Sequence, residues 1–151
     1  MRVFYLFILL IWISPNVKGQ LDSHSDYNKL HCVSIGVSDY KNIRSLNFAH
    51  NDAISFAEFV SKNQLWPKDK NIILLTDANA TAGKIYASLN KCMKDLDSND
   101  LFVFYFAGHA DTESIEDGAE SFLMAHDSEK NAYHQGGTLS AKNLEKYIQQ
   151  V

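Results

Sequence analysis

One histidine at the end of an apolar run is the residue of this chain best placed to do chemistry. Residues 101–107 read LFVFYFA, and the run breaks at Gly108, which is followed directly by His109. A short apolar run bounded by turn residues is typical of a strand buried on both faces of a parallel sheet. In open α/β sheets the ligand crevice lies just beyond the carboxyl ends of such strands. His109 is therefore a candidate general base.

The thiol that such a base would activate is not apparent in the chain. The sequence holds two cysteines, Cys32 and Cys92. Cys32 lies within an apolar run, and Cys92 shares helical spacing with Ile85 and Leu89, so both are expected in the core. A reactive thiol needs an exposed, electropositive setting, which neither position offers. Two cysteines are too few for a disulfide scaffold, and a Cys32–Cys92 bridge is left open.

The first nineteen residues have the pattern of a secretory signal. Arg2 supplies a positive start, residues 3–13 are apolar, and Val17 and Gly19 place small residues before Gln20. The apolar run is shorter than the roughly 20 residues that span a bilayer. We predict a cleaved signal peptide over 1–19 and a secreted or lumenal protein, the alternative being an uncleaved anchor or buried helix. After cleavage no membrane attachment is expected.

The charge balance limits the partners. The chain has 14 basic and 18 acidic side chains, a net charge of −4, and removal of residues 1–19 takes away Arg2 and Lys18. An acidic domain of this kind argues against nucleic acid or an anionic membrane as partner. Residues 79–81 read Asn-Ala-Thr, which makes Asn79 a candidate glycosylation site in a secreted chain.

The elements that must position His109 alternate regularly after a polar arm at 20–29. We expect strands at 30–37, 71–76 and 101–107, a helix that ends near Lys62, and a second helix at 81–96. One face of the first helix carries Leu46, Ala49, Ala53, Phe56, Ala57 and Val60. This β-α-β-α-β order predicts right-handed crossovers and a mostly parallel sheet with helices on both faces.

The chain beyond His109 is expected to be less regular. We predict a polar acidic loop at 111–120, a short extended piece at 121–125 and a further loop at 131–138. Ser140 is expected to cap a last helix that carries Leu144, Tyr147, Ile148 and Val151. The alternation then predicts another strand after Val151.

From about residue 30 to residue 148 the chain resembles the caspase-like cysteine peptidases (peptidase C14), and among them the metacaspases and bacterial caspase homologues. The matching segments follow one another in order: SIGVSDY at 34–40, NFAHNDA at 47–53, YFAGH at 105–109, DG at 117–118 with SFLMAHD at 121–127, and LS at 139–140. The resemblance implies a caspase-like three-layer α/β sandwich over 30–151, truncated before the strand that carries the family's nucleophile.

The resemblance also implies a Cys–His endopeptidase and assigns roles by position. His109 matches the dyad histidine, and the family's cysteine would follow the strand expected after Val151, so the chain alone should be inactive. Ala110 stands where the family usually has a glycine whose backbone N–H serves the oxyanion hole. Asp52 matches an acid that lines the S1 pocket of metacaspases and selects Arg or Lys. It is equally a first-turn acid favoured by the helix dipole.

Other readings remain beside this one. Many metacaspases depend on calcium, but the acidic residues of 111–120 lack EF-hand spacing and suit a solvated loop better. The spacing of His126, Asp127 and His134 matches no zinc pattern, and we predict neither a metal site nor a cofactor. The expected partners are a peptide or protein substrate and a small-subunit-like segment. The alternative functions are a secreted pseudopeptidase that binds protein or peptide, and a generic doubly wound binding domain.

Overall fold

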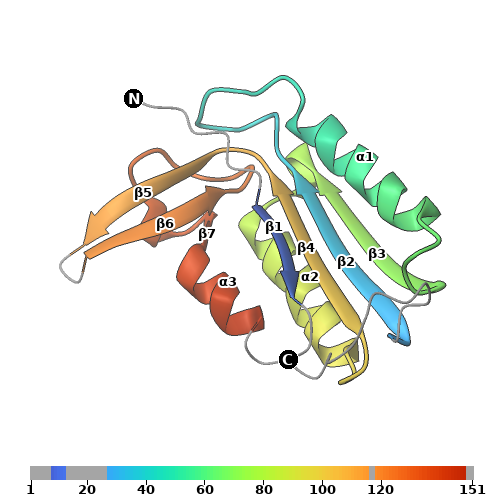
Figure 1. Ribbon diagram of the computed structural model, residues 1–151. Helices are drawn as coiled ribbons and strands as arrows, with labels where there is room; N and C mark the ends of the chain where they lie inside the picture. The colour runs from blue at the N-terminus through green and yellow to red at the C-terminus, as the bar shows by residue number, and fades with distance from the viewer. Residues whose placement is uncertain (1–7, 13–26, 116–117, 149–151) are drawn as a thin grey trace.

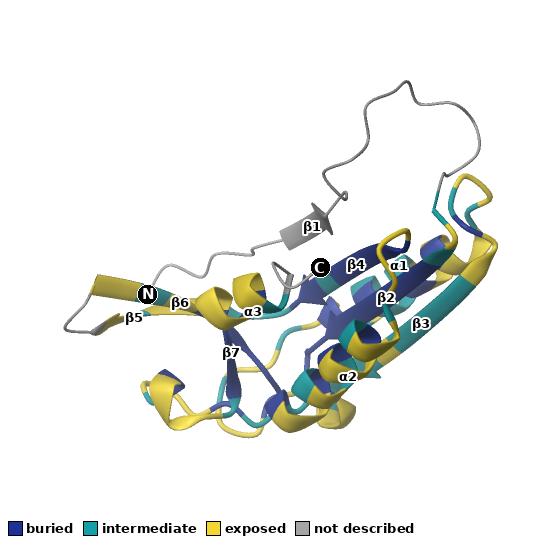
Figure 2. Ribbon diagram, turned by 90° about the horizontal axis from the view of Figure 1, so that it is seen from below, coloured by how far each residue is buried: buried dark blue, intermediate teal, exposed yellow. Residues whose placement is uncertain are grey.

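The main sheet has a parallel core and confirms the predicted α/β class (Figure 1). The computed structural model describes residues 8–12, 27–115 and 118–148. Strands β2 (Lys29–Gly36), β3 (Asp69–Thr76) and β4 (Leu101–Ala107) are parallel, and β1 (Ile8–Trp12) pairs antiparallel with β4. The strand order is β1-β4-β2-β3. Figure 2 shows β2 and β4 buried along most of their length, whereas β3, at the edge, is largely intermediate.

Two helices cover opposite faces of this sheet, in front of it and behind it in Figure 1. Helix α1 (Ala49–Lys62) packs its Val60 with Cys32 of β2 in one core cluster. Helix α2 (Ala82–Asp95) packs its Ile85 with Val33, the next residue of β2, in a second cluster. Successive side chains of a strand point to opposite faces. The result is the expected three-layer sandwich.

Helix α1 crosses very close to the end of β2. A Cβ atom built on Gly36 would lie 2.3 Å from the Ala49 carbonyl oxygen and 2.7 Å from the Ala53 Cβ. Only glycine therefore permits this crossing. The N-cap residue, Phe48, gives no side-chain hydrogen bond. Instead Ser38 Oγ accepts the His50 backbone N–H at 3.0 Å, so the loop before the helix caps it.

The prediction of an acidic loop at 111–120 is wrong, because residues 111–115 and 118–120 belong to strands of a second sheet. Strands β5 (Ala110–Ile115) and β6 (Gly118–Met124) form an antiparallel hairpin, and β7 (Thr138–Ser140) pairs with β6. Much of the hairpin is exposed. Such a hairpin needs no apolar face, so its residues lack the alternation that marks a half-buried strand.

The last helix begins where it was predicted. Helix α3 (Ala141–Ile148) follows β7, and Ser140 Oγ accepts the Asn143 backbone N–H at 3.2 Å. Leu144 is buried and Tyr147 half-buried, as its helical face requires. Val151 lies outside the described residues. Two short 3₁₀ turns complete the fold, at Asp77–Asn79 and Tyr133–Gln135.

The predicted signal peptide falls mostly on residues that the structure does not describe. Of 1–19 only Ile8–Trp12 is placed, as β1, and most of the arm at 20–29 is likewise outside the described part. Lys29 of that arm opens β2. Within the described ranges, no helix combines the length and apolar character needed to cross a membrane.

Candidate active site

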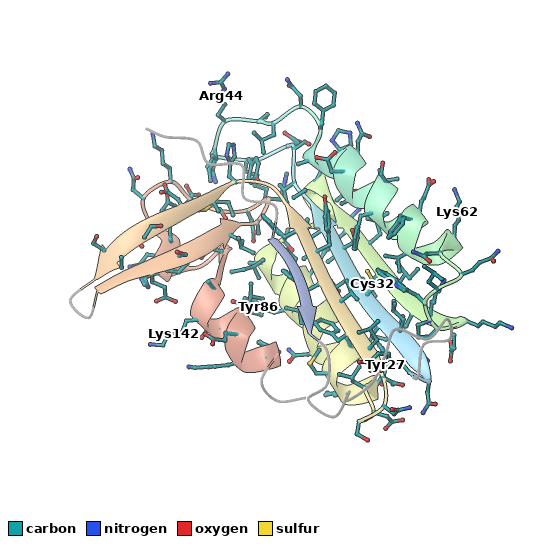
Figure 3. All side chains as sticks on the ribbon, viewed as in Figure 1. Tyr27, Cys32, Arg44, Lys62, Tyr86 and Lys142 are labelled. Atoms are coloured by element: carbon teal, nitrogen blue, oxygen red, sulfur yellow. The ribbon has the colours of Figure 1, made fainter. Side chains whose placement is uncertain are left out.

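Three hydrogen bonds hold His109 at the end of β4. Its backbone N–H donates to the Tyr40 hydroxyl at 2.8 Å, and its carbonyl accepts the Met124 N–H of β6 at 2.9 Å. Its ring Nε2 lies 2.8 Å from the Arg44 carbonyl oxygen. Arg44 is labelled in Figure 3 on the loop between β2 and α1. Backbone and imidazole are thus fixed by two other segments, the β2–α1 loop and β6.

The Arg44 contact determines which ring nitrogen can act as a base. A carbonyl oxygen only accepts hydrogen bonds, so Nε2 must carry a proton. In the neutral imidazole, Nδ1 then keeps its lone pair and is the atom able to take a proton. This is the arrangement that a general base needs, with one nitrogen held by an orienting acceptor and the other left for the reacting group.

The Tyr40 side chain packs against His109. Its side chain is buried, and its ring centroid lies 5.1 Å from that of His109. Burial raises the pKa of the Tyr40 hydroxyl, as does the charge of Asp77, although the His109 N–H opposes the rise. The same hydroxyl explains Gly108, because a Cβ there would lie 2.7 Å from the Tyr40 oxygen. Glycine before the histidine lets the two groups meet.

The loop that carries Tyr40 and Arg44 is itself held by neighbouring elements. Asp77, with a φ of 46°, accepts the backbone N–H groups of Ser38 and Asp39 at 2.8 and 2.9 Å. His126 Nδ1 lies 2.6 Å from the Asp39 carbonyl. These contacts join the ends of β3 and β6 to the loop. Asp77 was not singled out from the sequence, because it lies 39 positions from Ser38, whose N–H it accepts.

Alanine fits the position after the histidine without strain. Ala110 opens β5 and pairs with Leu123 of β6. Among the described non-glycine residues, a positive φ occurs at Asp77 and Asn131 and not at Ala110. The backbone angle therefore does not call for glycine, and Ala110 keeps its N–H.

Asp52 lies near Tyr105 of β4, the strand that precedes His109. It is half-buried in the first turn of α1. Burial raises the pKa of the Tyr105 hydroxyl, and the nearby Asp52 carboxylate adds to the rise. The Tyr105 ring stacks on Phe56, with centroids 4.2 Å apart and planes 11° from parallel. Asp52 thus borders an aromatic pair on the α1 face of β4.

Neither cysteine has the character of a nucleophile. Both are free thiols with no exposed surface, and they belong to the clusters on opposite faces of the sheet. Burial raises the pKa of Cys32 to about 12 and that of Cys92 to about 11. A thiol with so high a pKa is protonated at neutral pH and does not attack an amide. The bridge left open by the sequence is not formed.

The other ionisable candidates have separate partners. Asp127 accepts the Ala82 N–H at 2.9 Å and so caps α2, while His126 holds the Asp39 carbonyl. His134 Nε2 lies 3.5 Å from Glu113 of β5. The described part of the chain contains no group of three or more His, Cys, Asp or Glu side chains placed to bind a metal.

Asn79, the candidate glycosylation site, ends the 3₁₀ turn that follows β3. It is exposed, and its Oδ1 accepts a hydrogen bond from Lys84 Nζ at 2.8 Å. A glycan at Nδ2 would replace one amide hydrogen and leave this acceptor in place. Glycosylation stays a prediction.

The sandwich and the anchored histidine define a caspase-like α/β domain. The model of the metacaspase, peptidase C14 domain matches residues 31–150, and the chain belongs to this family. Among solved structures it is similar to protein GSU0716 from Geobacter sulfurreducens, with a TM-score of 0.64 and 18% identity. The match covers 79% of this chain and 44% of that one, so the chain spans less than half of that protein's length. The search of curated proteins found no match.

Proposed function

We propose that this chain is the histidine-bearing part of a cysteine endopeptidase, in which His109 is the general base of a Cys–His dyad. The observation that carries the proposal is the Arg44 carbonyl at His109 Nε2, which leaves Nδ1 as the basic atom. Family membership makes proteolysis the expected reaction and a protein or peptide the expected substrate. The thiol would come from a segment outside these residues, since Cys32 and Cys92 are both buried.

The reaction would use the site in two half-steps. Nδ1 of His109 takes the proton from the incoming thiol, and the thiolate adds to the scissile carbonyl. The resulting oxyanion would accept the Ala110 backbone N–H. As the C–N bond breaks, the imidazolium returns its proton to the leaving amine, and water then releases the acyl group from sulfur. Asp52 would pair with an Arg or Lys side chain on the amino-terminal side of the cleaved bond.

A second function follows if no thiol is supplied. The chain would then be a pseudopeptidase that binds a protein or peptide along the same edge of the sheet. The observation that favours it is the burial of both thiols, with a raised pKa at each. In either case residues 20–151 alone should not turn over peptides.

Reading the transcript past codon 151 separates the two functions. An open frame that continues into an apolar strand and an Asp-x-Cys turn supports the peptidase, whereas a stop codon supports the pseudopeptidase. In a thiol-bearing product, His109→Gln should lower kcat at least about 1000-fold, within the range of lost general acid–base catalysis combined with a lost dyad partner. His134→Gln is the matched control. Retained turnover in His109→Gln would refute the dyad assignment.

The proposed role of Asp52 has its own test in the same product. Asp52→Asn keeps the shape and removes the charge, so kcat/KM for Arg and Lys peptides should fall about 10- to 100-fold. Peptides with an uncharged residue at that position should be unaffected. Asp95→Asn, at the far end of α2, is the control. Unchanged preference in Asp52→Asn would leave Asp52 with only its helix-dipole role.

We also propose that the protein is secreted or lumenal, with residues 1–19 removed. The support is the charge and hydropathy pattern of that segment. Expression in a eukaryotic secretory host should give a product in the medium that begins at Gln20 and carries a glycan at Asn79. An intact amino terminus on an intracellular product would overturn this proposal.

A further inference from the structure

A cavity of about 390 Å³ lies away from the His109 site, between α2, α3 and the second sheet. None of the residues that hold His109 or border Asp52 lines it. Figure 3 labels two of its lining residues, Tyr86 from α2 and Lys142 from α3. The lining comes from α2, β6, the Tyr133–Gln135 turn, β7 and α3. Its volume is within the range of small-ligand pockets, roughly 300–1,000 Å³.

The lining carries more positive charge than its own carboxylates balance. Lys142 and Lys146 lie one helical turn apart on α3, and within the described residues neither makes an ion pair. The acid of the lining, Glu120, already accepts the Ser140 hydroxyl. His134 is near Glu113, which lies outside the lining. The two ammonium groups, both on exposed positions of α3, thus outnumber the one carboxylate of the lining.

Aromatic side chains form part of the wall, which is otherwise polar. Phe122 meets the His134 ring edge-on at 4.7 Å and the Tyr133 ring at 5.8 Å. Tyr86, on the opposite side, is half-buried and hydrogen-bonds to Asn143 of α3. These contacts fix the rings before any ligand arrives, which lowers the entropy cost of binding. A mainly polar lining that also holds a few aromatic side chains suits a small ligand that is charged at one end and apolar at the other.

We propose that this cavity binds a carboxylate attached to a small apolar group, with Lys142 and Lys146 on the carboxylate and the aromatic wall on the apolar part. The ligand is either a free organic acid or an acidic side chain next to an apolar one in a peptide. The chain as a whole is acidic, with a net charge of −4. Long-range attraction therefore does not favour an anion, and binding must come from the local lysine pair.

The test is an NMR titration of the ¹⁵N-labelled protein with three probes at 150 mM salt. These are 3-phenylpropionate, the uncharged 3-phenylpropanamide, and the capped dipeptide acetyl-Phe-Glu-amide. We expect saturable shifts at Ser140, Asn143 and Tyr86 with 3-phenylpropionate or the dipeptide, at a Kd of about 1 mM or below. The uncharged amide should shift them little. The acid that binds more tightly identifies the source of the carboxylate.

Two double lysine variants distinguish binding in this cavity from a general effect of the protein's charge. Lys142→Gln with Lys146→Gln should weaken binding at least about tenfold, as expected for lost charge-assisted hydrogen bonds. Lys91→Gln with Lys94→Gln removes the same charge from exposed positions of α2 outside the cavity and should change nothing. The proposal is overturned if no probe gives saturable shifts, if the uncharged amide binds equally, or if both double variants behave alike.

Discussion

At the scale of single residues, the site depends on contacts that orient one imidazole. All three hydrogen bonds to His109 come from residues that are distant in the sequence. His109 is held by Tyr40, by the Arg44 carbonyl and by Met124, which come from two other segments. Because the ring is already oriented in the free protein, less conformational entropy would be lost when a substrate binds. The groups that orient His109 are therefore as relevant to function as the ring itself.

Tyr40 provides the most direct test of this orientation. Tyr40→Phe removes the acceptor of the His109 N–H and leaves that donor without its partner, which should cost about 1–3 kcal/mol of unfolding free energy. The ring of Tyr40 remains, so the core beneath His109 is kept. Urea unfolding measures the loss, and the ¹H–¹⁵N signals of the His109 ring should change with it.

Tyr147→Phe is the control for that measurement. Its ring centroid lies 5.9 Å from that of Tyr86, and within the described residues its hydroxyl makes no hydrogen bond. It should leave both stability and the His109 signals unchanged. If Tyr40→Phe gave the same null result, the Tyr40 hydroxyl would not be what holds His109.

Sequence reasoning singled out His109 as the candidate base but not the atoms that orient it. His109 stands out because an apolar strand ends there, which is a local signal. Arg44 acts through its carbonyl, which every residue possesses, so side-chain type carries no information about this contact. Tyr40 lies 69 positions from His109. It belongs to a segment that resembles the family, yet only the fold shows that its hydroxyl meets the histidine backbone.

At the scale of elements, α1 must pack at a fixed, short distance from β2 for Asp52 to border β4. Gly36 permits that distance, because a Cβ atom at this position would clash with the backbone oxygen of Ala49. Backbone cannot move aside as a flexible side chain can. The helix would have to shift as a unit, and Asp52 and the Ser38 cap would shift with it.

A pair of glycine substitutions tests this crossing. Gly36→Ala should destabilise the protein by about 1–3 kcal/mol, the usual cost of overpacking. Gly83→Ala, in the first turn of α2, meets nothing within 4 Å and should instead stabilise by up to about 1 kcal/mol. Thermal unfolding of the two variants should therefore shift in opposite directions. A shift in the same direction would show that the close crossing of α1 is not what requires glycine.

The elements that face the core were predictable, and the hairpin was not. The strand at 101–107 matches β4, and the predicted buried face of α1 includes Ala49, Ala53, Ala57 and Val60. Burial against a core imposes a regular spacing of apolar residues, which can be recognised in the sequence. The β5–β6 hairpin is exposed over much of both strands, and strands of that kind carry little burial pattern. Its charges suggested a loop, whereas Asp111 accepts the Tyr133 hydroxyl at 2.7 Å.

At the scale of the whole molecule, the two thiols couple the fold to pH. Cys32 and Cys92 sit in the two clusters on either side of the sheet, so each titration reports on one layer of the sandwich. Burial raises the pKa of both from 9.0, to about 12 and about 11. In the unfolded chain they ionise near their ordinary value. Above that pH the folded state therefore binds more protons than the unfolded state.

The sign of the linkage follows from this difference. Stability falls with pH wherever the folded state holds more protons, so the contribution is complete below about pH 9 and is lost as the pH rises toward 11 and 12. Between pH 7.5 and 9.5 each thiol should cost up to about 1 kcal/mol of unfolding free energy. Urea unfolding at the two pH values, in a reductant that prevents oxidation, measures the sum. Tyrosines with a raised pKa contribute mainly nearer pH 10.

Two alanine variants test whether the thiols cause this pH dependence of the unfolding free energy. Cys32→Ala and Cys92→Ala each open a small space and lower stability at every pH, so the quantity to compare is the change between pH 7.5 and 9.5. Each single variant should lose part of the wild-type change and the double variant most of it, and because Cys92 adds to the raised pKa of Cys32, the two single losses need not add exactly. If the double variant kept the full slope, the thiols would not be the titrating groups. The same result would also reopen their reactivity, since a thiol ionised in the folded state is a nucleophile.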